Sequence, residues 1–124
     1  MARLVTISIV LLALASGRSA QAGDPQRGAN VFRTQCSMCH SGVRAGPANF
    51  GPNLFGIVGR KPGSLPGFDY SQALKSAPAL WTPDRLRSFV ETPGTAVPGV
   101  KMPYAGLRDP DAREDLIAYL ATLK

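Results

Sequence analysis

The chain has 124 residues, of which fourteen are basic and eight are acidic, so its formal net charge is +6 at pH 7. This length suits one domain with a hydrophobic core of modest size. The positive charge is mild and lacks the basic runs and interleaved aromatic residues that would indicate a nucleic-acid-binding protein.

The first 22 residues have the features of a secretory signal peptide. An apolar stretch from Leu4 to Ala15 follows a basic N-terminal region, and Ala20 and Ala22 fit the Ala-x-Ala cleavage rule. The apolar stretch is shorter than the ~20 residues that a bilayer-spanning helix requires. We expect cleavage after Ala22, export to the periplasm of a bacterium, and one mature domain of residues 23–124. The alternative is an uncleaved leader that anchors the protein to the membrane.

Three segments begin with a helix-capping residue followed by proline, which suits the first position of a helix. These pairs are Asp24-Pro25, Thr82-Pro83 and Asp109-Pro110. The residues that mark their buried faces are Gly28, Phe32 and Cys36 in the first segment, Leu86, Phe89 and Val90 in the second, and Leu116, Ile117, Leu120 and Leu123 in the third. Thr92-Pro93-Gly94 is expected to end the second helix, and a short additional helix is expected from Ser71 to Lys75.

Residues 41–68 are predicted to form a long loop. They contain seven glycines and four prolines, and their apolar residues follow neither a helical nor a strand period. A loop of this length is unusual in a compact domain unless it packs around something other than peptide. Because no useful strand-like alternation occurs in the sequence, we predict an all-α protein.

The segment Cys36-Ser37-Met38-Cys39-His40 has the C-x-x-C-H pattern of c-type haem attachment. Two thiols at this spacing lie on one side of a helical turn and can add to the two vinyl groups of haem, while the adjacent imidazole can reach the iron. A dithiol redox pair, a partial zinc site and a chance match are the alternatives. A thioredoxin-like pair would need a βαβ context, and zinc would need a fourth ligand. We therefore expect one haem c, bound covalently through Cys36 and Cys39.

Met102 is the predicted second axial ligand, opposite His40. His40 is the only histidine, Met1 leaves with the leader, and Met38 lies inside the thioether loop on the histidine side. Residues 98–103 are kept out of helix by proline and glycine and can lie across a flat ligand. The alternative is an ordinary methionine beside an open or water-bound iron. Because His/Met ligation raises the potential and disfavours O₂ chemistry, we expect an electron carrier without catalytic residues.

Several further stretches match a known family. They are Gly51-Pro52-Asn53-Leu54, Gly59-Arg60-Lys61, Pro66-Gly67-Phe68-Asp69-Tyr70, Trp81, Pro98-Gly99-Val100-Lys101-Met102 and Arg113-Glu114-Asp115-Leu116-Ile117-Ala118-Tyr119-Leu120. With them, residues 23–124 resemble the class I c-type cytochromes, the group of mitochondrial cytochrome c and bacterial cytochrome c2. The resemblance implies a fold of three to five helices with long loops wrapped around one covalently bound haem. It also implies that Gly28 and Phe32 lie where the first helix crosses the last, with Gly28 permitting close backbone approach.

The resemblance implies roles for individual residues around the haem. The proline that matches Pro52 accepts a hydrogen bond from the proximal imidazole in this family. The tyrosine and tryptophan that match Tyr70 and Trp81 bond to a buried haem propionate, and the arginine that matches Arg60 lies near it. Ser71, which follows Tyr70, is also expected among the cofactor-binding residues.

We therefore predict a soluble, monomeric one-electron carrier of the periplasm that has protein redox partners and no small-molecule substrate. Basic residues around the exposed haem edge, Lys101 among them, are expected to dock acidic partner surfaces through a small, charge-steered interface. Two alternatives remain open. One is a haem enzyme or ligand sensor in which Met102 dissociates, and the other is a dedicated electron acceptor for one periplasmic dehydrogenase.

Overall fold

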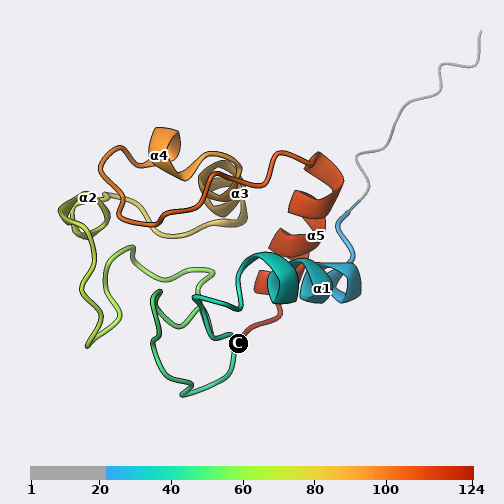
Figure 1. Cartoon of the computed structure of the whole chain (residues 1–124), viewed down its shortest axis with the longest axis horizontal. Helices are drawn as coiled ribbons and strands as arrows, with labels where there is room; N and C mark the ends of the chain where they lie inside the picture. Colours follow the sequence, from blue (N-terminus) through green and yellow to red (C-terminus); the bar gives the residue numbers. More distant parts are fainter. Residues whose placement is uncertain (1–21) are drawn as a thin grey trace, which may run out of the picture.

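The computed structural model describes residues 22–124, and within this range the chain folds into five helices and no β-strand (Figure 1). The helices are α1 (Pro25–Gln35), α2 (Gln72–Lys75), α3 (Pro83–Glu91), α4 (Pro93–Ala96) and α5 (Pro110–Leu120). The predicted all-α class is confirmed. Residues 1–21 of the predicted signal peptide lie outside the described range. None of the helices in residues 22–124 is both long enough and apolar enough to cross a membrane.

The longer helices begin where their capping residues predict. The side chain of Asp24 accepts the backbone N–H of Gln26 at 2.7 Å, and that of Thr82 accepts the N–H of Arg85 at 3.2 Å. Asp109 caps α5 in the same way. In each case proline follows the cap, at a position where its missing N–H would have no partner inside the helix.

The helix ends differ from the expected boundaries. Cys36 was expected inside the first helix, but it has left the helical conformation with φ −121° and ψ −34°, although its N–H still donates to the carbonyl of Phe32. Leu123 was expected on the stripe of the last helix, which instead ends at Leu120. It is nevertheless buried, because a turn in which its N–H donates to the Leu120 carbonyl at 3.2 Å continues the chain inward.

Helix α4 was not predicted. Thr92-Pro93-Gly94 does end α3, but Pro93 is also the first residue of a new one-turn helix. The same property accounts for both outcomes, because proline cannot continue a helix and is well suited to start one.

Helices α1 and α5 come from opposite ends of the domain and pack directly against each other (Figure 1). A Cβ atom added to Gly28 would lie 1.9 Å from the carbonyl oxygen of Asp115 and 2.7 Å from Cβ of Tyr119. The ring of Phe32 packs against that of Tyr119 with centroids 5.3 Å apart. The predicted crossing is therefore confirmed, and it depends on the absence of a side chain at Gly28.

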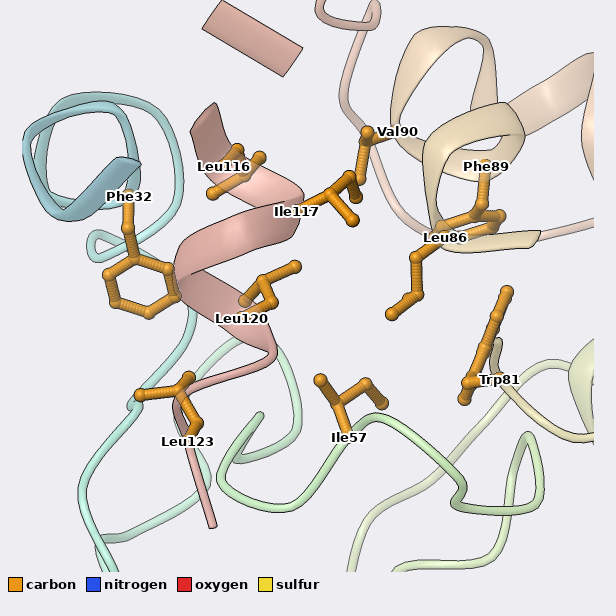
Figure 2. Close-up of a cluster of buried hydrophobic side chains, with 10 residues drawn as sticks. All are labelled: Phe32, Ile57, Trp81, Leu86, Phe89, Val90, Leu116, Ile117, Leu120 and Leu123. Atoms are coloured by element: carbon orange, nitrogen blue, oxygen red, sulfur yellow. The ribbon is translucent and has the colours of Figure 1, made fainter. Parts of the chain in front are cut away.

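One apolar core joins α1, α3, α5 and the loops. Its buried members are Phe32, Ile57, Trp81, Leu86, Phe89, Val90, Leu116, Ile117, Leu120 and Leu123. Figure 2 shows Leu86 of α3, Leu120 of α5 and Ile57 of the long loop pointing toward the same central region. The loop that was predicted for residues 41–68 is present, and it contributes to the core rather than only connecting helices.

Asp115 connects α5 to the start of α1. Its side chain is only 8% exposed, and its carboxylate accepts hydrogen bonds from Nε of Arg27 at 2.7 Å and from the backbone N–H of Asp24 at 2.6 Å. The hydrogen bond from Arg27 is the main reason why the pKa of Asp115 is lowered, and burial acts in the opposite direction. The folded protein therefore stabilises the ionised form of Asp115.

Gly28→Ala should destabilise the protein by about 2–3 kcal/mol, because the new methyl group would overlap the backbone of α5. Gly94→Ala is a matched control, since an added Cβ there has no heavy atom within 4 Å. The control should be neutral or stabilise by up to ~1 kcal/mol. Guanidinium unfolding of both variants measures the difference, and equal midpoints would contradict the close approach of the two helices.

Asp115→Asn should destabilise the protein at pH 7 by about 1–2 kcal/mol, a range reduced because Arg27 is largely exposed. Since the folded pKa of Asp115 is lowered, its contribution is present above the unfolded pKa of ~3.9 and is lost as the pH falls through the folded pKa. The difference between wild type and variant should therefore shrink toward acid pH in denaturation curves. Asp84→Asn, at an exposed carboxylate, should show a smaller difference.

Candidate haem-binding site

The C-x-x-C-H segment forms a tight turn directly after α1. The carbonyl of Cys36 accepts the N–H of Cys39 at 3.0 Å and the N–H of His40 at 2.9 Å. Neither cysteine is in a disulfide, and both are half-buried. The turn keeps the two thiols and the imidazole within one short segment, as the attachment motif requires.

The surroundings of Cys36 do not favour the alternative interpretations of the motif. Burial, with a smaller effect of Cys39, raises the pKa of Cys36 to about 11, so the thiol is protonated at neutral pH. Reactive cysteines of dithiol redox pairs have lowered pKa values instead. In residues 22–124 there is no strand for a βαβ unit, and no group of three or more His, Cys, Asp or Glu side chains is placed to hold a metal ion.

His40 is oriented by the backbone of residues 51 and 52. Its Nδ1 lies 2.8 Å from the carbonyl oxygen of Pro52, the contact that the family resemblance implies. Because a carbonyl can only accept a hydrogen bond, Nδ1 must carry the proton, which leaves the lone pair of Nε2 available for a metal. Burial lowers the pKa of His40 against the opposing effect of Pro52, so the neutral, ligand-competent imidazole is favoured.

The backbone of Gly51 packs directly against this imidazole. A Cβ atom at Gly51 would lie 2.4 Å from Cε1 of His40 and 2.7 Å from its Nδ1. Any side chain at this position would displace the ring. The Gly-Pro pair therefore fixes the imidazole from two directions, by close contact and by hydrogen bonding.

Asn53 organises the loop that delivers this Gly-Pro pair, and sequence reasoning assigned it no role. It is 7% exposed, and its Nδ2 donates to the carbonyls of Val43 at 2.9 Å and Gly46 at 2.8 Å. Its Oδ1 accepts the N–H of Phe55 at 2.7 Å. The only indication in the sequence was its position directly after Gly51-Pro52.

Arg60, Tyr70 and Trp81 are brought together in the structure. Residues 59 and 60 pair with Trp81 through two backbone hydrogen bonds, in which Trp81 N–H donates to Arg60 at 2.9 Å and Gly59 N–H donates to Trp81 at 2.7 Å. Burial raises the pKa of Tyr70, and Arg60 is close enough to oppose that shift. The guanidinium of Arg60 donates to the carbonyl of Asn53 at 2.9 Å, which connects this group to the loop beneath His40.

Ser71 is buried beside Tyr70, and the structure gives it a local partner. Its hydroxyl oxygen accepts the N–H of Leu74 at 3.2 Å and so caps α2. Capping accounts for the serine in this position. Within the described residues the hydroxyl of Ser71 makes no hydrogen bond to Arg60, Tyr70 or Trp81, so its capping bond to α2 is the contact that the structure gives it.

The Met102 segment, residues 98–106, lies against the same apolar core as Cys36. Both residues are partly buried and pack on the core cluster. The segment is irregular, as expected, and Gly99 takes a φ of +90° that favours glycine. Two residues after Met102, the hydroxyl of Tyr104 donates to Oε1 of Gln35 at 3.1 Å. The Met102 segment therefore lies beside the end of α1, next to the C-x-x-C-H turn.

The residues described here fit haem c. They include two free thiols in one turn, an imidazole whose Nε2 is available for iron, a thioether on the shared apolar core, and polar side chains suited to a propionate. The role of Ser71 as a cofactor-binding residue stays a prediction.

The comparisons with known proteins agree with this chemistry. The family model described as Cytochrome c matches residues 25–124. The cytochrome c2 of Rhodopila globiformis is 47% identical over 106 residues, which cover 86% of this chain and 99% of the relative. The cytochrome c of Arabidopsis thaliana is 43% identical over 99 residues, covering 79% and 88% of the two chains. The cytochrome c2 of Rhodomicrobium vannielii is 42% identical over 119 residues, covering 95% and 94%. The chain therefore belongs to the cytochrome c family of electron-transfer proteins, which carry haem c bound covalently through two cysteines.

Proposed function

We propose that this protein is a soluble one-electron carrier of the periplasm, in which His40 and Met102 are the axial ligands of the haem iron. The orientation of His40 carries this proposal, because its bond to Pro52 leaves Nε2 as the only ring nitrogen that can bind a metal. Haem c, held through Cys36 and Cys39, supplies the one-electron couple of its iron. Met102 is the one methionine besides the exposed Met38 in residues 22–124.

The protein residues would tune that couple through polarity. The core around Cys36 and Met102 is apolar, and a thioether ligand in apolar surroundings favours the ferrous state and raises the potential. Ligation also requires a neutral imidazole, which the lowered pKa of His40 favours. These residues suit an electron carrier, because a sphere filled by two protein ligands leaves no position for a substrate.

Tyr70, Trp81 and Arg60 are the proposed partners of a haem propionate. Arg60 pairs with Trp81 through the backbone and is close enough to Tyr70 to act on its pKa. Both Tyr70 and Trp81 are buried, and buried tyrosine and tryptophan usually hydrogen-bond a partner through their polar atom. Arg60 already donates to the carbonyls of Asn53 and Phe55. We therefore propose that Arg60 acts on the propionate mainly through its charge, while Tyr70 and Trp81 donate the hydrogen bonds.

Cytochrome c proteins act with redox partner proteins. Lys101 is the proposed docking residue, and it is 62% exposed in the Met102 segment. The structure adds a feature that the sequence did not indicate, since its Nζ bonds to Oδ2 of Asp69 at 3.0 Å. The other carboxylate oxygen of Asp69, Oδ1, lies 3.9 Å from Nζ of Lys75. An acidic partner would therefore meet Lys101 with part of its charge already offset.

The oxidised protein should be low-spin and show the weak far-red band of sulfur bound to ferric iron. Met102→Ala should abolish this band and lower the midpoint potential by at least ~0.1 V, since axial ligands set haem potentials over about 0.8 V. Met38→Leu is the control, because Met38 is 86% exposed, and both properties should be retained. Absorption spectra and voltammetry measure them. High-spin features in the wild type, or a band that survives Met102→Ala, would favour an open-iron sensor or enzyme instead.

Export can be checked on the same preparation by intact mass. The purified periplasmic protein should begin at Gly23 and carry the mass of one haem. Cys36→Ala/Cys39→Ala should remove the covalent haem without changing the N-terminus. A mass that retains residues 1–22 would contradict leader cleavage and support a membrane anchor.

A further inference from the structure

Tyr104 links the two segments that flank the proposed haem. Its hydroxyl donates to Oε1 of Gln35 at 3.1 Å, although the two residues are 69 positions apart. Gln35 is the last residue of α1 and directly precedes Cys36. Tyr104 follows Met102 by two residues, and its N–H donates to the Met102 carbonyl at 3.0 Å. One hydrogen bond thus joins the cysteine side of the site to the methionine side.

Few other contacts of this kind restrain the Met102 segment. Near its start Lys101 bonds to Asp69, and directly after residue 106 the N–H of Leu107 donates to the carbonyl of Val90 at 2.8 Å. Within residues 22–124, the Tyr104 hydroxyl makes the only hydrogen bond from residues 102–106 to another segment. Movement of residues 102–106 is therefore opposed by this bond more directly than by any other hydrogen bond.

Packing does not enclose the Tyr104 ring completely. The ring is half-buried, and on one side it lines a cavity of about 220 Å³ together with Thr92, Thr95 and Arg108. A tyrosine hydroxyl is protonated at neutral pH, so it can donate to Oε1 of Gln35. The hydrogen bond to Gln35 therefore adds a directional restraint to a ring that packing encloses only in part.

We propose that the Tyr104–Gln35 hydrogen bond is a clasp that positions the Met102 segment and slows the departure of Met102 from the iron. The inference rests on the proposed His40/Met102 ligation. The N–H of Tyr104 donates to the carbonyl of Met102, so a backbone shift that carries Met102 away from the iron would also move Tyr104. Tyr104 and Gln35 are positioning residues, since neither is required to touch the iron.

The rate at which imidazole displaces Met102 in the ferric holoprotein tests the clasp. At saturating imidazole this rate is limited by the departure of Met102. The rate is measured as the loss of the far-red band with time. Tyr104→Phe and Gln35→Leu should each raise the rate by up to about fivefold, the effect of one exposed hydrogen bond. Because both changes break the same bond, the double variant should be no faster than the quicker single variant.

Two further variants separate a clasp from a general loss of stability. Gln35→Glu keeps an oxygen acceptor for the Tyr104 hydroxyl and should retain the wild-type rate. Tyr119→Phe removes a hydroxyl from a ring that packs on Phe32 in the α1–α5 interface and should also leave the rate unchanged. Faster amide exchange at residues 104–106 in the reduced Tyr104→Phe protein is the accompanying structural change.

Failure of the clasp can be distinguished from failure of the proposed function. If the wild type shows the far-red band but Tyr104→Phe and Gln35→Leu react at the wild-type rate, the clasp is wrong and the ligation stands. Strictly additive effects in the double variant, or an equal increase in Tyr119→Phe, would also overturn the clasp. If the wild type lacks the band, Met102 is not a ligand and both proposals fall.

Discussion

The bond from Nδ1 of His40 to the Pro52 carbonyl determines which chemistry the site can perform. A free imidazole can bind a metal through either nitrogen and in many orientations. Here the carbonyl of Pro52 accepts a hydrogen bond from Nδ1 and Gly51 packs against the ring, so that Nε2 is the nitrogen left for a metal. Much of the loop after the attachment motif serves this contact, since Asn53 folds residues 43–55 back so that Pro52 returns to His40.

The packing of α1 against α5 positions the cysteine end of the same site. Gly28 lets α1 approach the backbone of α5, and the end of α1 then delivers Cys36 to the apolar core. Asp115 secures this arrangement near the N-terminus by binding Arg27 and the backbone of Asp24. Attachment chemistry at Cys36 and the stability of the helix pair are therefore connected through one rigid element.

Features that are encoded locally were predictable. Helix starts followed from Asp24, Thr82 and Asp109, because a cap and a following proline act within one turn. Haem attachment at residues 36–40 was also predictable, since the motif is defined by the spacing of its two cysteines and histidine. Helix α4 was missed because Pro93 can end one helix and begin another, and the sequence does not show that both occur at the same residue.

Features that depend on distant partners were not predictable from the residues themselves. The contact between His40 and Pro52 was expected only through a family resemblance. Asn53, the Asp69–Lys101 pair and the Tyr104–Gln35 bond leave no local pattern, because each depends on where a loop returns in space. The capping bond of Ser71 to α2 was likewise not predicted, and the role of Ser71 in cofactor binding stays a prediction.

The pairing of α1 with α5 also has a consequence for the order of assembly. A chain that emerges N-terminus first presents Pro25–Gln35 long before Pro110–Leu120 is available. Contacts between these helices cannot form until α5 has been made, and pairing over such a sequence distance slows folding. During that interval Cys36 and Cys39 have no completed core around them, so their thiols stay accessible to a large planar molecule. The pairing of α1 with α5 therefore leaves Cys36 and Cys39 accessible early in folding and buries them in part once folding is complete.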